Sequence, residues 1–280
     1  MADHGTDGEW DLIVTPWHVD EHLPAFPVPA AATEVVPPDL PSGPVPARMS
    51  LLHRAAVDAV TRAVRPLVLS GDCPTARATV AGLQRRHRDL AVLWLDAHGD
   101  FNTPAISTSG YLGGMALAML TGRTPGLFDD THDLRPVPDA SVVLADARDL
   151  DPAERDALAA SHVRRVPADP AAITSALGRL GSAPVYLHLD IDVIDGAQLP
   201  GARFPSGPGP SLAQIEECLA AACAAADVSG AYIACAWLPE HVSDQTSRQT
   251  ITRLTSALGA DLAWPEPAGP SHTPGSPANT

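Results

Sequence analysis

Acidic and imidazole side chains gather at two points of this sequence, each next to a run of apolar residues. Asp96, His98 and Asp100 follow the apolar run LWL, and Asp190 and Asp192 lie within VYLHLDIDVID. Residues i, i+2 and i+4 of an extended strand point to the same side, so each set can converge on one point. Buried carboxylates this close repel one another unless a cation neutralises them. Since no Arg or Lys stands beside either set, a metal ion is the expected counter-charge.

The donor atoms in these two sets are mostly oxygen. Four carboxylates with one imidazole favour Mn²⁺ or Mg²⁺ over a structural zinc, and some carboxylates could bridge two ions. Two ions about 3.5–4 Å apart activate a water as hydroxide. A single DxD could be a loop, and DAHGD could be a turn with a helix cap, but both together after apolar strands favour a metal centre. The expected ligands are Asp96, His98, Asp100, Asp190 and Asp192.

Two neighbouring residues are expected to support these ligands rather than to join them. Asp195 comes three residues after Asp192, which favours a turn or a position in contact with a metal ligand instead of with the metal. His188 shares a strand face with Asp190 but comes two residues earlier, which favours the core or a supporting position.

The apolar runs that lead to these residues alternate with helical patterns. Buried strands are predicted at 11–15, 66–70, 90–95, 141–145, 185–191 and 231–237. Helices are predicted near 47–64, 74–86, 112–121, 152–160, 169–180, 211–226 and 243–258, and Ser211 with Gln214 forms a capping box. The alternation predicts an α/β fold, a single-domain three-layer sandwich with a mostly parallel central sheet. Ligands of such sheets bind outside the carboxyl ends of the strands.

The ends of the chain and one internal stretch differ from this pattern. Residues 21–46 are rich in proline and predict an extended surface loop, and residues 265–280 lack apolar content and predict a disordered tail. The α/β domain is therefore expected to span residues 1–264, with the proline-rich loop inside it. Hydrophobic residues make up 45% of the chain, enough for one large core.

Charge and composition exclude several classes of function. The net charge of −15 argues against nucleic acid and suits a metal ion or a cationic small molecule. No apolar stretch approaches the roughly 20 residues that span a bilayer, and the acidic, polar N-terminus favours a cytoplasmic protein. Four cysteines without a CxxC indicate neither a zinc ribbon nor a disulfide framework. Cys218, Cys223 and Cys235 are expected in the core.

The motifs between about 66 and 240 resemble those of the ureohydrolase family, which includes arginases and agmatinases. DAHGDFNTPAISTSG is close to the family signature that begins DAHxDxNTP, LHLDIDVID matches its DxDxxD strand, and ARDLDPAE resembles the segment that holds the substrate amino group. The resemblance implies an arginase-like fold, two Mn²⁺ ions and hydrolysis of the guanidino group of a small amino-acid substrate. It also implies a homo-oligomer, because members of this family are often oligomeric.

The resemblance implies a role for each matching residue. Asp96 and Asp190 would bridge the two metals, Asp100 would bind the first, and His98 and Asp192 would bind the second; Asp100, His98 and Asp192 are the expected catalytic set. Substrate would be held at its α-carboxylate by Asn102, Ser107 and Ser109, and at its α-ammonium by Asp151 and Glu154. The last two could also be acidic residues of a first helical turn, favoured by the helix dipole, and both roles are compatible.

Three positions depart from the family pattern. Cys73 stands where the family has a metal-binding His, and its thiolate would shift the preference towards zinc, cobalt or iron; Cys73 could instead be no ligand, but its place at a strand end favours a ligand. Gly113 stands where arginases have a His that shuttles protons, with Tyr111 in place of an Asn. A family Glu that pairs with the guanidinium falls near Ala236, and the nearby Glu240 could serve instead.

These departures favour a substrate that needs less proton transfer and less pairing of a full positive charge. An N-hydroxyguanidine fits, because its hydroxyl withdraws electrons and lowers the basicity of the group. The expected reaction is hydrolysis of Nω-hydroxy-L-arginine to hydroxyurea and L-ornithine, a step of antibiotic biosynthesis. The alternatives are an ordinary arginase or agmatinase, and a metal-binding homologue without catalytic activity.

Overall fold

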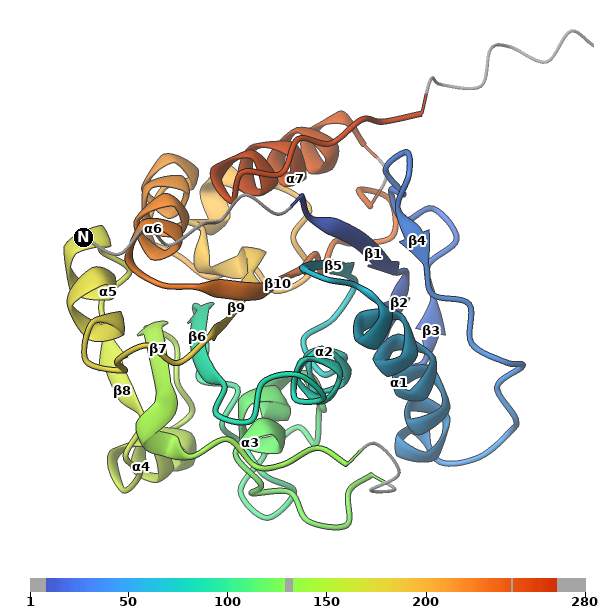
Figure 1. Cartoon of the computed structure of the whole chain (residues 1–280). Coiled ribbons are helices and arrows are strands. Elements are labelled where there is room, and N and C mark those ends of the chain that lie inside the picture. The colour runs from blue at the N-terminus through green and yellow to red at the C-terminus, as the bar shows by residue number, and fades with distance from the viewer. Residues whose placement is uncertain (1–8, 129–132, 243, 266–280) are drawn as a thin grey trace, which may run out of the picture.

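One parallel sheet forms the centre of the computed structural model, which describes residues 9–128, 133–242 and 244–265 (Figure 1). Every strand pair within this sheet is parallel. The order across the sheet is β4 (Thr33–Glu34), β1 (Asp11–Thr15), β5 (Pro66–Ser70), β10 (Val228–Ala234), β9 (Val185–Asp190), β6 (Ala91–Asp96), β7 (Val142–Asp146) and β8 (Arg164–Val166).

Helices cover both faces of the sheet, as Figure 1 shows. One face packs on α5 (Pro170–Leu177), α6 (Leu212–Ala225) and α7 (Gln245–Ala257). The other packs on α1 (Val45–Arg62), α2 (Ala76–Leu83), α3 (Ala116–Leu120) and α4 (Pro152–Ala159). Because side chains alternate along a strand, Leu187 and Leu189 of β9 enter the first cluster, whereas Tyr186 enters the second. The predicted single-domain three-layer α/β fold is confirmed.

Strand order brings together the polar residues that lie at the carboxyl ends of β5, β6 and β9. β5 and β6 follow each other among the sheet strands in sequence, yet β10 and β9 lie between them. From the neighbouring strands β6 and β9 the chain continues in opposite directions across the sheet, to β7 and to β10. Crevices outside the carboxyl ends of such strands bind ligands.

The predicted elements agree with the structure where local pattern decides. The predicted strands at 11–15 and 66–70 coincide with β1 and β5, and α6 begins with the predicted capping box, in which Ser211 accepts from the Gln214 amide. The predicted helix at 112–121 is split, because a 3₁₀ turn precedes α3. The 3₁₀ turns of the described residues are Gly113–Met115, Asp139–Ser141, Ile191–Val193 and Gly196–Gln198.

Tertiary pairing decides the remaining differences. β10 begins at Val228 and ends at Ala234, so the strand predicted at 231–237 is wrong at both ends. The segment Val-Ser-Gly at its start lacks an apolar pattern but pairs with β9, and Trp237 forms an isolated antiparallel bridge with Ala202 after the strand ends. β8, with the sequence RRV, was not predicted because an edge strand needs neither apolar faces nor length.

The stretch at 21–46 is only partly the loop that its prolines predict. β4 within it pairs in parallel with β1, and β3 (Glu21–His22) pairs antiparallel with β2 (Trp17–His18) in a separate two-stranded sheet. The helix α1 begins at Val45. Pairing of two residues at an edge leaves the intervening prolines free of the hydrogen-bond ladder. Most of the predicted tail at 265–280 lies outside the described residues, which contain no helix long and apolar enough to cross a membrane.

Candidate metal centre and active site

A cavity of about 310 Å³ lies at the carboxyl ends of the central strands. Asp96 is the last residue of β6 and Asp190 the last of β9, whereas Cys73 and Ala236 follow β5 and β10 by a few residues. The lining contains most of the residues that the sequence singled out, namely Cys73, His98, Asp100, Asn102, Ser107, Ser109, Asp151, Glu154, Asp190 and Asp192. It also contains Asp72, Asp149 and Phe204, which the sequence did not single out.

Short polar contacts hold the strand-end residues in one cluster. His98 places Nδ1 3.0 Å from Asp192 Oδ2 and 3.5 Å from Asp96 Oδ1. The Cys73 thiol donates to Asp190 Oδ2 at 2.8 Å. Asp96 is 1% exposed and accepts from the His98 amide at 2.7 Å, so it lies beneath the cavity and anchors the loop that follows β6. Acidic groups from β5, β6 and β9 thus share one buried volume.

Three carboxylates of this cluster resist ionisation, whereas burial of Asp96 is outweighed by hydrogen bonds from His98, which lower the pKa of Asp96. Burial raises the pKa of Asp100 and of Asp190 well above the usual range, and the neighbouring Asp96 and other carboxylates raise both further. Burial and the charge of Asp96 raise the pKa of Asp192 to about 7. Burial lowers the pKa of His98, but hydrogen bonds to Asp192 and Asp96 outweigh it and raise the value to about 12. A divalent cation bound among these groups would favour their ionised forms.

The donor set fits divalent cations. Asp96 belongs to two groups whose ligand atoms lie within 4.8 Å of one another, one with His98 and Asp192 and the other with Cys73 and His188. Membership in both groups is what a bridging carboxylate requires.

Two further observations support the same fit. Asp100 has a buried Oδ2 without a hydrogen-bond partner, and its backbone has the left-handed φ of +49°, which is strained for a residue other than glycine. Arg148 does not neutralise the cluster, because its guanidinium binds the Asp146 carboxylate and the main-chain carbonyls of Asp192 and Val193.

His188 lies closer to the candidate metal ligands than the sequence indicated, because it forms a group with Cys73 and Asp96. Its ring stacks on Trp94, with 3.4 Å between centroids, and on Tyr232 at 5.0 Å. The Tyr186 hydroxyl lies 3.1 Å from Nδ1, whereas Nε2 is buried without a hydrogen-bond partner. Burial lowers the pKa of His188 to about 3, so the ring is neutral and Nε2 can act as a ligand. The signal in the sequence was its position two residues before Asp190 on the same strand face.

The residues expected to bind the amino-acid end surround another part of the cavity. Asn102 Nδ2 donates to Asp151 Oδ2 at 3.2 Å. Asp151 precedes α4 but makes no side-chain cap, so its carboxylate faces Asn102 instead of closing the helix. Glu154 is buried and accepts from the Phe101 amide at 2.8 Å, so it also fixes the loop after β6. Gly99 leaves the room this contact needs, because a Cβ there would lie 2.8 Å from Glu154 Cδ.

The serines, Asp195 and Glu240 have different positions. Ser107 and Ser109 line the cavity, and each accepts from a main-chain amide of its own loop, Gly110 and Tyr111 respectively. Asp195 accepts from the Ala197 amide in a turn outside the lining. Glu240 is exposed and is not part of the lining, whereas Ala236 is. The structure therefore does not bring Glu240 together with the other expected substrate residues.

The sequence profile of the arginase family matches residues 23–262. The chain belongs to the arginase family. Within the family it is 34% identical over 166 residues to the N(omega)-hydroxy-L-arginine amidinohydrolase of Streptomyces lavendulae, covering 59% of this chain and 58% of that protein. It is also 34% identical over 170 residues to the arginase of Brevibacillus brevis, covering 55% of each. The matched segments thus span little more than half the length of these curated relatives.

Solved structures of the family share the fold. The arginase of Bacillus cereus superposes with a TM-score of 0.75 at 21% identity, covering 90% of this chain and 98% of that one. The proclavaminate amidino hydrolase of Streptomyces clavuligerus gives 0.63 at 16% identity, covering 89% and 91%. The predicted resemblance to ureohydrolases and the arginase-like fold are confirmed.

Proposed function

We propose that this arginase-family chain hydrolyses Nω-hydroxy-L-arginine to hydroxyurea and L-ornithine with two divalent metal ions. The observation that carries the proposal is one cavity that Cys73, His98, Asp190 and Asp192 line beside the Asn102–Asp151 pair, with Asp96, the residue shared by both candidate metal groups, buried beneath it. A volume of about 310 Å³ suits a ligand of amino-acid size. The named relative from Streptomyces lavendulae supports the choice of substrate.

The metals would be held by Asp96, Asp190 and Asp192, with His98 on one side and Asp100 and Cys73 on the other. Divalent ions at these positions supply Lewis acidity and make water nucleophilic at neutral pH. The carboxylate-rich set favours Mn²⁺, and the Cys73 thiolate, formed only when a metal displaces its proton, adds affinity for softer ions. His98 can ligate only after it loses its proton, so metal binding releases protons from this cluster.

The chain's other residues orient the substrate. Asp151 and Glu154 offer carboxylates to an α-ammonium, and Asn102, Ser107 and Ser109 offer hydrogen-bond donors to an α-carboxylate. A zwitterion held at both charged ends leaves its side chain to extend towards the metal groups. This arrangement converts binding of the amino-acid end into positioning of the reacting carbon.

The wall at Ala236 favours a hydroxyguanidine over a guanidine. Ala236 offers no carboxylate to pair with a guanidinium, and Glu240 is exposed beyond the lining. A full positive charge moved into this site without a dedicated partner would lose hydration. The hydroxyguanidino group is less basic, so its neutral form enters at a lower desolvation cost.

The test is turnover of Nω-hydroxy-L-arginine, L-arginine and agmatine, measured side by side with the Mn²⁺-loaded protein. We expect kcat/KM for the hydroxylated substrate to exceed the other two by at least about tenfold, a difference of about 1.4 kcal/mol. Preference for plain arginine would reassign the chain to ordinary arginases. Release of neither urea nor hydroxyurea from any of the three would indicate a homologue without catalytic activity.

A further inference from the structure

Tyr111 occupies the part of the cavity wall that Gly113 leaves open. A Cβ added to Gly113 would overlap the Tyr111 ring and lie 2.8 Å from its hydroxyl oxygen. Tyr111 therefore excludes any larger side chain at position 113 and presents its own polar group there. Both residues line the cavity.

His18 fixes the direction of the Tyr111 hydroxyl. The ring of His18 is 7% exposed, with Nδ1 2.8 Å from the Gly71 carbonyl oxygen and Nε2 3.1 Å from the Tyr111 hydroxyl. A carbonyl oxygen can only accept, so Nδ1 carries the proton. The Tyr111 hydroxyl lies 3.1 Å from Nε2 and donates to it when this nitrogen carries no proton. The lone pairs of the Tyr111 oxygen remain free to accept a hydrogen bond in the cavity.

The hydroxyl of Tyr111 faces the metal-binding end of the cavity. Its partner His18 binds the carbonyl oxygen of Gly71, two residues before Cys73, so the hydroxyl lies near the carboxyl end of β5. Burial raises the pKa of Tyr111. The phenol therefore stays un-ionised and lies where the side-chain end of the substrate would reach.

We propose that Tyr111 is the specificity-determining residue for the hydroxyguanidino group, and that His18 is its positioning residue. The Tyr111 oxygen accepts the hydrogen bond of the substrate N–OH, while His18 keeps the phenolic proton turned away from the cavity. A neutral acceptor suits a neutral hydroxyguanidine, whereas a guanidine lacks the O–H donor that this contact uses. The inference rests on the proposed function and names how the substrate is distinguished.

Tyr111→Phe tests the contact because it keeps the ring over Gly113 and removes only the hydroxyl. The ratio of kcat/KM for Nω-hydroxy-L-arginine over L-arginine should fall about 10- to 100-fold, because a site built to bind a hydroxyl discriminates by that bond. The loss should be mostly in KM for the hydroxylated substrate. A ratio that stays within about twofold of wild type, in a variant that melts at the wild-type temperature, would overturn the proposal.

His18 variants distinguish positioning from a general loss of structure. His18→Phe should lower the same ratio, and the double variant with Tyr111→Phe should be no worse than Tyr111→Phe alone. His18→Gln should restore part of the ratio, because its amide oxygen can accept the phenolic proton. Additive losses, or no rescue by Gln, would remove His18 from this role.

The chain contains a matched control pair. The Tyr186 hydroxyl lies 3.1 Å from His188 Nδ1, the same separation as in the Tyr111–His18 pair, but Tyr186 is fully buried and outside the cavity lining. Tyr186→Phe should cost stability and leave the substrate ratio unchanged. A fall in the ratio equal to that of Tyr111→Phe would contradict specificity of the contact.

Binding separates failure of this inference from failure of the proposed function. Calorimetric titration of metal-free wild type and Tyr111→Phe with each of the two amino acids measures the contact without turnover. If wild type hydrolyses neither compound, the proposed reaction is wrong, yet a preference for the hydroxylated ligand that Tyr111→Phe abolishes still supports the contact. Equal preference in both proteins would reject it.

Discussion

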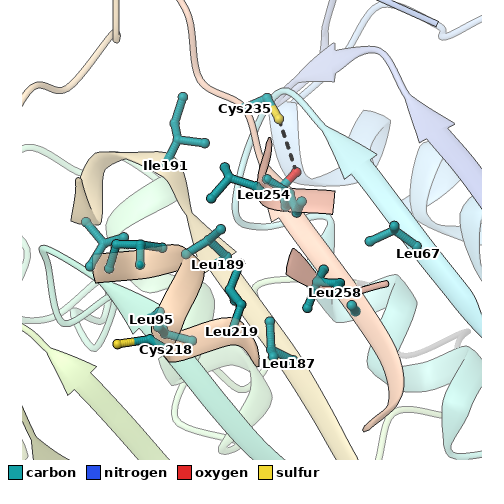
Figure 2. Packing of buried hydrophobic residues seen from close by; sticks show 14 of the residues in the cluster. Leu67, Leu95, Leu187, Leu189, Ile191, Cys218, Leu219, Cys235, Leu254 and Leu258 are labelled. Carbon is teal, nitrogen blue, oxygen red and sulfur yellow. Dashed lines mark hydrogen bonds between the residues drawn. The ribbon is translucent and has the colours of Figure 1, made fainter. Parts of the chain in front are cut away.

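The same strands carry two different environments, an apolar face under α5, α6 and α7 and a polar carboxyl edge. On the apolar face Leu187 and Leu189 of β9 pack with Leu219 of α6, and all are fully buried (Figure 2). At the edge the next residue on β9 is Asp190, as deeply placed but surrounded by carboxylates. Burial stabilises the fold in the first region, at about 1.5–3 kcal/mol per large aliphatic side chain. In the second it opposes the charges that a metal ion needs.

Two buried cysteines show the contrast in a single residue type. Cys235 donates to the Ile233 carbonyl oxygen, a main-chain group next to the apolar face (Figure 2). Cys73 donates instead to the Asp190 carboxylate. Burial raises the pKa of both thiols, and the charge of Asp190 raises both further, but within the described part of the chain Cys73 is the cysteine that belongs to a group of possible metal ligands. The partner of a thiol, more than its burial, separates a packing role from a chemical one.

The largest expected effect, on turnover, comes from replacing a carboxylate at the polar carboxyl edge of the sheet. Asp100→Asn keeps the shape of a side chain whose Oδ2 has no partner and removes one charge from the cluster. Turnover of Nω-hydroxy-L-arginine should fall on the order of 10³-fold, whereas the unfolding free energy of the metal-free protein should stay level or rise because repulsion is relieved. Asp195→Asn, in a turn outside the cavity, is the control and should retain turnover. Full activity in Asp100→Asn would remove this carboxylate from the centre.

A substitution on the apolar face should lower stability without changing turnover. Leu219→Ala should lower the unfolding free energy by about 3 kcal/mol because it leaves a cavity among α6 and β9. Metal content and kcat of the folded fraction should not change. Val64→Ala, at a position that is 81% exposed, should shift stability by less than about 0.5 kcal/mol. Chemical denaturation and elemental analysis on the same samples measure stability and metal content. Loss of metal from folded Leu219→Ala would contradict the claim that the apolar face contributes to stability alone.

The two cysteines give the next comparison. Cys73→Ala should lower bound metal and activity together, by about 10- to 100-fold in metal affinity. Cys235→Ala removes the same atoms from a buried site and should reduce stability alone. If metal stoichiometry and rate are unchanged in Cys73→Ala, the thiol is not a ligand and the first site relies on other residues, of which His188 is the nearest candidate.

The smallest effect is a pH dependence of the metal-free protein. Burial and the charge of Asp96 raise the pKa of Asp192 to about 7 in the folded chain, from 3.8 for an ordinary aspartate, so between these limits the folded chain holds a proton that the unfolded chain has released. Stability should therefore fall as pH rises, by about 1 kcal/mol between pH 5 and 6 from Asp192 alone, and Asp100 and Asp190, whose pKa values are also raised, add to this fall. Saturating Mn²⁺ should abolish or reverse this slope. Urea unfolding at the two pH values, with and without metal, measures it; a metal-free protein that gains stability over this interval would contradict the charged-cluster account.

The sequence predicted the apolar strands and the strand-end ligands because both are encoded locally. The apolar runs brought Asp96 and Asp190 to the carboxyl ends of β6 and β9, whereas His98 lies in a loop and Asp192 in a 3₁₀ turn, where strand alternation does not apply. It could not predict that β10 and β9 separate β5 from β6, since strand order is decided by packing over long distances in the chain. His18 was missed for the same reason: it lies on a two-residue strand, and only the tertiary fold brings it to Tyr111.

The most direct test of the central claim is the number of divalent ions bound per chain. After loading with Mn²⁺ and dialysis, elemental analysis should find two ions per folded chain in wild type and fewer in Asp100→Asn. A well-folded wild-type chain that retains one ion or none would contradict the assembly of a two-metal centre from Asp96, Asp190 and their neighbours.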